Sequence, residues 1–230
     1  MKLRTPLDRR TVETHFRYHK WQYLLILVLP VVAWNLIYAQ TAYRVPQDKR
    51  LDVYIQSSTA DQDQVNAFLK PIWEEAVPEQ ELVSAVLLLA SGGEDDYYAN
   101  VQLVTYLAAA EGDIYLLSSS DFKRIASQGA FVPLEPYRDQ GLLDTGEVDI
   151  SAGYVQLLED DGQGGLRAGE RRLFGIPAFT LYNLASELRI DNRDKVFAIA
   201  GNSGNEEAAV RLLSALVART TGPMPDFFKQ

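Results

Sequence analysis

The feature that most constrains this chain is a run of 19 residues without a charged side chain, from Trp21 to Ala39. An apolar helix of about 20 residues crosses a hydrocarbon core of roughly 30 Å, so the run predicts one membrane-spanning helix. The 20 residues before it carry six basic and two acidic side chains. Because basic residues hold short flanking segments in the cytoplasm, we expect the N-terminus there. Everything after about Gln40 should then lie on the outer side of the plasma membrane.

Two other interpretations of this run compete with a membrane anchor: a cleaved signal peptide and a buried core helix. Signal peptidase needs small residues at two positions separated by one, and the segments 37–39 and 39–41 each supply only half of that pattern. The chain has no cysteine, so a lipid cannot be attached to a cysteine after cleavage. A permanent helical anchor, in contact with the lipid bilayer, is therefore favoured.

Three residues inside the run indicate packing against another membrane protein. Pro30 lacks a backbone donor, so a carbonyl one turn earlier loses its helical partner. Asn35 brings an amide into the apolar segment, and Trp34 can face a partner helix instead of the headgroups. We expect these three residues to contact an integral-membrane partner, while a lone anchor with a kink at Pro30 is the simpler alternative.

The part of the chain after the predicted span is strongly acidic. Residues 40–230 carry 16 basic and 29 acidic side chains, a net charge of −13, against +4 for residues 1–20. Nucleic acids and anionic headgroups are poor partners for such a part, because binding them needs clustered lysine and arginine. The absence of cysteine excludes disulfides and thiolate zinc sites. About 190 residues remain outside the membrane, enough for one domain with a buried core.

Short apolar runs alternate with helical patterns in this part, which predicts an α/β fold with a mostly parallel sheet flanked by helices. Strands are expected at 51–56, 82–90 and 113–117, and helices at 65–76, 94–110 and 121–128. The second of these helices aligns Val101, Val104 and Ala108 on one face. Because β-α-β crossovers join parallel neighbours, the first three strands should run parallel.

Three turns match the capping-box spacing, in which a hydroxyl residue precedes Glu or Gln by three positions; they start at Thr59, Ser91 and Ser203. Helix capping is thus a sufficient structural role for these hydroxyls. In open parallel sheets, however, ligands bind beyond the carboxyl ends of the strands, where such turns converge. The candidate solute-binding residues on this rim are Ser57, Ser58, Thr59, Ser91, Gly92, Ser118, Ser119, Ser120 and Asp121.

From Glu111 to Tyr137 the chain reads EGDIYLLSSSDFKRIASQGAFVPLEPY and resembles the extracellular solute-binding proteins of bacterial ABC importers, which have a type 2 periplasmic-binding-protein fold. The matching positions are Asp113, Tyr115, Leu116, Gly129, Ala130, Phe131, Pro133, Leu134 and Tyr137. Further matches are the segment Gly175–Pro177 and the strand Phe197–Ala200, which a helical pattern at 205–217 follows. The resemblance spans residues 51–217 and implies the fold of one lobe of such a protein.

A departure from this family is as informative as the matches. Between Pro177 and Val196 the family inserts a second lobe, whereas this chain has only 18 residues there. Because two lobes bury a solute by closing around it, one lobe should bind weakly. The function we therefore expect is an accessory or assembly subunit of a membrane complex, with ABC transporter subunits as partners. The alternative is a protein that binds or senses a sugar, peptide or other small solute directly.

No catalytic constellation is recognisable, so we expect neither an enzyme nor a cofactor or metal site. Both histidines, His15 and His19, precede the predicted span. The acidic triplets 94–96 and 159–161 lack the spacing of a calcium-binding loop. Residues 139–172 are expected to form a long charged loop with one short helix near Tyr154 to Leu158. The expected organisation is a cytoplasmic leader 1–20, the span 21–39, a linker 40–50, the outer domain 51–218 and a tail 219–230.

Overall fold

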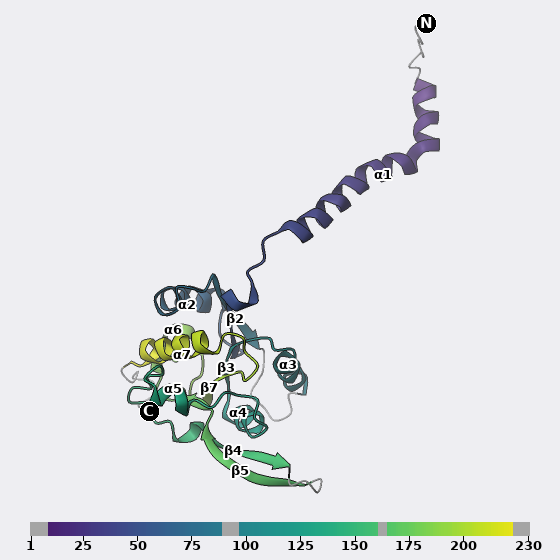
Figure 1. The fold of residues 1–230 in the computed structure, drawn as a ribbon. Helices are drawn as coiled ribbons and strands as arrows, with labels where there is room; N and C mark the ends of the chain where they lie inside the picture. Colours follow the sequence, from purple (N-terminus) through teal and green to yellow (C-terminus); the bar gives the residue numbers. More distant parts are fainter. Residues whose placement is uncertain (1–8, 89–96, 161–164, 223–230) are drawn as a thin grey trace. The chain divides into compact units, whose positions relative to one another are not determined.

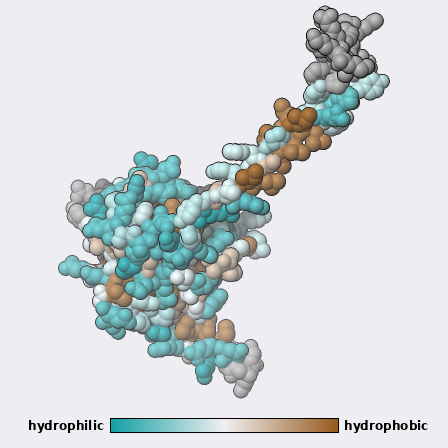
Figure 2. Space-filling view, turned by 45° about the horizontal axis from the view of Figure 1, so that its top comes forward, coloured by the Kyte–Doolittle hydropathy of each residue, from teal (hydrophilic) through white to brown (hydrophobic). Residues whose placement is uncertain are grey.

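The computed structural model describes residues 9–88, 97–160 and 165–222, with side chains from residue 18 onward. The chain divides into two compact units, Met1–Arg44 and Val45–Gln230. The first unit contains helix α1 (Arg9–Thr41), which continues through Pro30 without a break (Figure 1). Its segment Tyr18–Thr41 has 24 residues and a mean hydropathy of 1.8, so it is long and apolar enough to cross a membrane. Figure 2 shows the apolar side chains of this helix in brown.

The second unit is built on a five-stranded sheet with the strand order β2-β1-β3-β7-β6. Strand β1 (Arg50–Gln56) lies between β2 (Leu82–Leu88) and β3 (Ile114–Ser118) and is parallel to both. Strand β7 (Lys195–Ile199) runs antiparallel to β3 and to β6 (Gly175–Pro177). Only β7 therefore runs against the other strands, and the predicted α/β fold with a mostly parallel sheet is confirmed.

Helices cover both faces of the sheet (Figure 1). Helices α2 (Gln62–Ala76), α6 (Tyr182–Leu188) and α7 (Glu206–Thr220) contribute to one apolar core. Helices α3 (Tyr97–Ala108) and α4 (Ser119–Ala126) contribute to a second core on the opposite face. Because side chains alternate along a strand, neighbouring residues of β3 enter different cores, Leu116 the first and Tyr115 the second.

Helix α3 differs from the prediction in what it buries. The expected helical face of Val101, Val104 and Ala108 exists, but it points to solvent: Val101 and Val104 are 47% and 48% exposed. Leu103 and Leu107 pack against the sheet instead. The larger leucine side chains remove more apolar surface from water than the valines would, which favours this rotation of the helix. The expected start of the helix at Glu94 lies outside the described residues.

The predicted loop from 139 to 172 with a short helix at Tyr154–Leu158 is wrong. After helix α5 (Glu135–Asp139) and the short 3-10 helix η2 (Ser151–Gly153), strands β4 (Tyr154–Asp160) and β5 (Leu166–Leu173) form an antiparallel hairpin. The backbone groups of this segment are paired across the hairpin, and only Val155 and Leu173 are buried, so a helix there would lack a sufficient apolar face.

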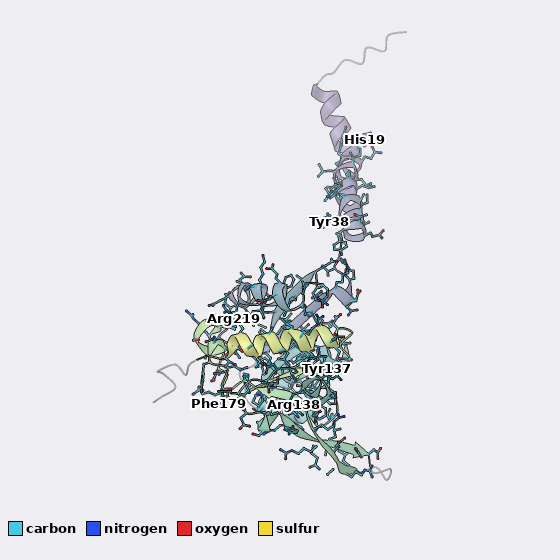
Figure 3. The ribbon with its side chains drawn as sticks, turned by 60° about the vertical axis from the view of Figure 1, so that its left-hand side comes forward. His19, Tyr38, Tyr137, Arg138, Phe179 and Arg219 are labelled. Carbon is cyan, nitrogen blue, oxygen red and sulfur yellow. The ribbon has the colours of Figure 1, made fainter. Side chains whose placement is uncertain are left out.

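Helix α5 connects the hairpin with α7 on the surface of the domain. Figure 3 labels its residues Tyr137 and Arg138. The Tyr137 hydroxyl donates a hydrogen bond to Glu206 at the start of α7. Arg138 Nη1 donates to the Tyr154 hydroxyl on β4 over 3.4 Å. These contacts tie the hairpin and α5 to the sheet-covering helices.

The connection between β6 and β7 consists of residues 178–194 and contains only the seven-residue helix α6. No second lobe is inserted in this part of the chain, as the sequence predicted. The second unit is therefore one α/β domain, and no further domain is inserted between β6 and β7. A short 3-10 helix, η1 (Gln47–Lys49), precedes β1.

Candidate functional site

The predicted rim lies at the carboxyl ends of β1 and β3, where Gln56 connects the two strands. Its amide Nε2 donates to Asp121 Oδ2 over 2.9 Å, and its Oε1 accepts from the Ser118 backbone N–H over 2.6 Å. Ser118 caps α4 by accepting from the Asp121 backbone N–H. The Ser118 hydroxyl lies 3.0 Å from Asp121 Oδ2 and 3.1 Å from the Ser120 hydroxyl. The structure thus brings Ser118, Ser120 and Asp121 together at this rim.

Asp121 is occupied by partners from within the domain. Arg124 Nη2 donates to Asp121 Oδ1 over 2.8 Å and also to Asn100 Oδ1 on α3 over 2.9 Å. Partial burial acts to raise the pKa of Asp121, but hydrogen bonds from Arg124, Gln56 and Ser118 outweigh it and lower the pKa below its usual value. The carboxylate is therefore stabilised in its charged form without any ligand.

The hydroxyl groups after β1 have internal partners as well. The Ser57 hydroxyl accepts from the backbone N–H groups of Thr59 and Ala60, and the Thr59 hydroxyl donates to the Arg189 carbonyl over 2.6 Å. Ser58 is exposed, and Ser119 donates its backbone N–H to the Asp194 carbonyl. Ser91 and Gly92 lie outside the described residues.

Two of the predicted capping boxes are wrong. Helix α2 is capped by Asp61, which accepts from the Gln64 backbone N–H, and not by Thr59. Ser203 donates to Asp113 Oδ1 instead of capping α7, whose N-cap Asn205 makes no side-chain cap bond. In both turns the hydroxyl found an acceptor from a distant segment, which a local spacing rule cannot anticipate. The third box starts at Ser91, outside the described residues.

Sequence reasoning missed Lys195, which lies opposite Ser118 in the antiparallel pair of β3 and β7. Burial lowers the pKa of Lys195, against the attraction of Asp194, Asp191 and Asp121, which acts in the opposite direction. In the sequence Lys195 stands near Asp191 and Asp194, which gives no indication of the rim. The pairing of β7 with β3 is what places Lys195 beside Ser118. The rim therefore combines hydroxyls, a carboxylate and a half-buried cation.

Replacing Asp121 by asparagine should destabilise the domain at pH 7 by about 1.5–3 kcal/mol, because a charged hydrogen-bond acceptor is lost. Folding lowers the pKa of the Asp121 carboxyl below its value of 3.8 in the unfolded chain. The stabilisation that Asp121 provides is therefore complete above pH 3.8 and is lost as the pH falls through the lower pKa of the folded state. The difference between wild type and variant should therefore shrink below pH 3.8. Urea unfolding between pH 2 and 7 measures it. In the exposed pair of Asp191 and Arg193, Asp191→Asn serves as the control, with an expected effect of at most about 1 kcal/mol.

A hollow lies at the opposite end of the sheet, at the amino ends of β1 and β3. Its volume is about 680 Å³. Four of its lining side chains are acidic and one is basic: Asp48, Asp52, Glu111, Asp113 and Arg50. Tyr54, Asn202 and Asn205 add an aromatic ring and two amides. The sequence did not predict this cavity, because its walls come from the segment before β1, the end of α3 and the turn before α7.

The acidic wall of this cavity is held by short contacts. Asp113 Oδ2 accepts from the Asp52 backbone N–H over 2.9 Å, and Asp113 Oδ1 accepts from the Ser203 hydroxyl over 2.6 Å. Burial raises the pKa of Asp113, although these hydrogen bonds act to lower it. Burial, with the charges of Glu111 and Asp52, raises the pKa of Tyr54 to about 12. Gly112, with φ of +85°, lies under the Tyr54 ring, where a Cβ atom would be 2.4 Å from Cδ2.

Among the residues that the structure describes, no group of three or more His, Cys, Asp or Glu side chains is arranged to hold a metal ion. In the acidic triplet 159–161, Glu159 forms an ion pair with Arg167 across the hairpin over 2.8 Å. The other triplet, 94–96, lies outside the described residues. Both regions therefore present polar and charged groups, among them the Ser118 hydroxyl within 3.0 Å of Asp121 Oδ2.

The chain matches no protein-family model and no curated protein. It is similar to a family 1 extracellular solute-binding protein from Alicyclobacillus acidocaldarius, with 18% identity and a TM-score of 0.37 over 60% of this chain and 29% of that one. A spermidine/putrescine ABC transporter substrate-binding protein from Streptococcus pneumoniae is 8% identical, with a TM-score of 0.44 over 75% of this chain and 79% of that one.

An ABC substrate-binding protein from Listeria monocytogenes in complex with cycloalternan is 17% identical, with a TM-score of 0.35 over 60% of this chain and 33% of that one. The chain thus spans less than a third of the solute-binding protein from Alicyclobacillus acidocaldarius. These structures are of the class of proteins that the segment around residues 111–137 resembles, and the likeness covers part of each chain.

Proposed function

We propose that this protein is a membrane-anchored accessory or assembly subunit of a membrane complex, in particular of an ABC transporter. In this proposal residues 1–20 are a cytoplasmic leader, 21–39 span the membrane and 40–50 are the linker. The domain 51–218 and the tail 219–230 then lie outside the cytoplasm. The protein acts through its helix and the surface of its domain, and it is not an enzyme.

The observation that carries this proposal is the short connection between β6 and β7. Residues 178–194 form only α6 and its flanking turns, so this connection offers no second wall that could close over the strand ends. The rim itself already satisfies its polar groups, because both Asp121 oxygens and the hydroxyls of Ser57 and Thr59 have partners within the domain. A solute binding there would have to break these bonds, so tight capture at the rim is unfavourable.

The anchor helix supplies the proposed contact with membrane partners. Trp34 is 71% exposed, which leaves a large aromatic surface for packing against another helix. Asn35 Nδ2 donates to the Val31 carbonyl over 2.9 Å, and its amide oxygen remains available as an acceptor for a partner donor. Pro30 lies one turn before Trp34 and leaves a carbonyl without its usual intrahelical donor. These features support the three predicted contact residues.

Affinity purification of the full chain from membranes in a mild detergent tests the proposal. We expect integral-membrane proteins, ABC transporter subunits among them, to co-purify with the wild type. The variant Trp34→Ala with Asn35→Leu should lose most of this co-purification. Leu25→Ala on the opposite side of the helix, where Leu25 is 59% exposed, serves as the matched control and should not change it. Recovery of this chain alone would contradict the proposal.

A second candidate function is direct binding or sensing of a small solute. The specific observation in its favour is the cavity of about 680 Å³, a size typical of small-molecule sites. Its four carboxyl groups against one guanidinium favour a cationic solute over an anionic one. Under this alternative the predicted rim residues form a second, weaker site. Sugars and peptides are the other solute classes that this alternative assigns to that rim.

Ligand-dependent thermal stability separates the two functions. A solute that binds only the folded state raises the free energy of unfolding, and hence the melting temperature, with the logarithm of one plus its concentration over its dissociation constant. If the second candidate holds, a cationic member of a solute library should raise the melting temperature, and Asp52→Asn should abolish that shift. If no member of the library changes the melting temperature while partners co-purify, the accessory function is favoured.

A further inference from the structure

We infer that the exposed face of α3 contacts the lipid headgroup region of the bilayer in which the chain is anchored. The inference rests on the membrane anchor of the proposed function, but it is independent of any protein partner. This surface, here called the α3 face, consists of Tyr97, Val101, Val104 and Ala108. No described residue of the second unit covers it, because all four side chains are exposed.

The α3 face is a continuous apolar stripe. The four positions have the spacing i, i+4, i+7 and i+11, which places them in one line along a helix. Tyr97 is 72% exposed at one end of the stripe, and neighbouring Tyr98 is 85% exposed. The residues that hold α3 on the sheet, Leu103 and Leu107, lie on another side of the helix. The helix is thus apolar on two sides, and only one of them is used by the fold.

The charge distribution favours lipid as the occupant of this face. Residues 97–110 contain no charged side chain, whereas residues 40–230 carry a net charge of −13. An uncharged helix that begins with two tyrosines is unusual on such an acidic surface, because exposed helix faces normally carry charges. Tyrosine rings favour the depth of the lipid headgroups, and valine side chains favour the adjoining acyl boundary. The α3 face therefore has the composition of an interfacial surface, and the acidic surroundings favour a bilayer of uncharged or zwitterionic lipids over an anionic one.

The tether keeps this face within reach of the membrane. Only residues 42–46 separate the end of α1 from η1, and an extended chain of five residues spans at most about 18 Å. Gln47, the first residue after the tether, lines the same cavity as Ala110, which lies two residues after the end of α3. The carboxyl end of the α3 face thus lies near the point where the domain is attached to the proposed span.

Spin labelling of the full chain in phosphatidylcholine nanodiscs tests this inference. The chain has no cysteine, so Val104→Cys introduces a single labelling site. Leu158→Cys on β4 is the matched control, because Leu158 is 47% exposed and Val104 is 48% exposed. We expect the label at position 104 to show a several-fold lower collision rate with a water-soluble nickel chelate than the label at 158. Its collision rate with oxygen, which is enriched in lipid, should be higher.

A charged substitution gives a second, independent measurement. Val101→Glu in the Val104→Cys chain should restore nickel access at position 104, because a carboxylate resists transfer out of water. Val101 is half exposed, so the domain should stay folded. Equal nickel access at positions 104 and 158 would overturn the inference, and so would dipolar broadening between labels, which would assign the face to a second copy. Failure of the chain to enter nanodiscs would refute the anchor itself, which is distinct from both outcomes.

Discussion

Replacing Gly153 by alanine is expected to lower the free energy of unfolding of residues 45–230 by about 3 kcal/mol or more. A Cβ atom at this position would lie 1.8 Å from the Gly175 carbonyl oxygen and 2.8 Å from its carbonyl carbon. Both are backbone atoms of β6, so no side-chain rotation can relieve the overlap. The Gly153 carbonyl also accepts a hydrogen bond from the Phe174 backbone N–H over 3.0 Å, and that bond would be lost if η2 and β6 moved apart.

Thermal unfolding of the wild type and the variant measures this effect. For a domain of this size, 3 kcal/mol corresponds to a fall in melting temperature of roughly 6–12 °C. Gly204→Ala is the matched control, because a Cβ atom there meets nothing within 4 Å and Gly204 has no left-handed φ. Its effect should stay within about 0.5 kcal/mol. Equal melting temperatures for Gly153→Ala and Gly204→Ala would show that η2 and β6 are not packed as described.

Those parts of the fold that bury apolar runs could be predicted from the sequence. Strands β1, β2 and β3 are continuous apolar runs in the sequence, because a strand buried on both faces needs apolar residues throughout. Helix α2, which ends before Pro78, shows the 3.6-residue periodicity of a helix buried on one face. The β4–β5 hairpin could not be predicted in this way, since most of its side chains face solvent on both sides. The sequence DGQGG, which separates the two short strand segments, is the one local indication of a hairpin. A glycine-rich sequence of this kind occurs equally in long loops, so it does not distinguish the two.

The candidate sites show a different limit. The rim residues Ser118 and Asp121 could be predicted from topology, because the carboxyl ends of parallel strands meet at one edge. What the sequence could not show is that Gln56 and Arg124 already occupy their polar atoms. The acidic cavity escaped prediction because Asp52 and Asp113 come together only through the register of β1 against β3. The exposed α3 face escaped it because spacing predicts which residues share a face but not which face is buried.

In the short connection between β6 and β7, one buried polar side chain links the first residues to the last. Asn192 is 0% exposed, and its Nδ2 donates to the carbonyls of Ala178, Phe179 and Leu181 over 2.9, 3.0 and 3.2 Å. It therefore fixes the start of the connection to its end. Phe179, labelled in Figure 3, is half exposed next to this contact, so apolar burial contributes less there. The amide thus restrains the segment 178–181 together with the buried Leu181 and the hydrogen bond from the Ala178 backbone N–H to the Lys195 carbonyl.

Changing Asn192 to aspartate should destabilise the domain by at least about 3 kcal/mol at pH 7, because it removes the donor and faces a buried carboxylate with three carbonyl oxygens. Burial should raise the folded pKa of the introduced carboxyl above its unfolded value of about 3.9. Protonation then restores a donor, so the deficit should shrink as the pH falls through the folded pKa.

Urea unfolding at pH 7 and pH 4.5 measures this dependence. Asn183→Asp, at a half-exposed amide with a single hydrogen bond to the Arg219 carbonyl over 3.0 Å, should cost about 1 kcal/mol with little change between the two pH values. A deficit at position 192 that is equally large at both pH values would contradict the donor role of Asn192.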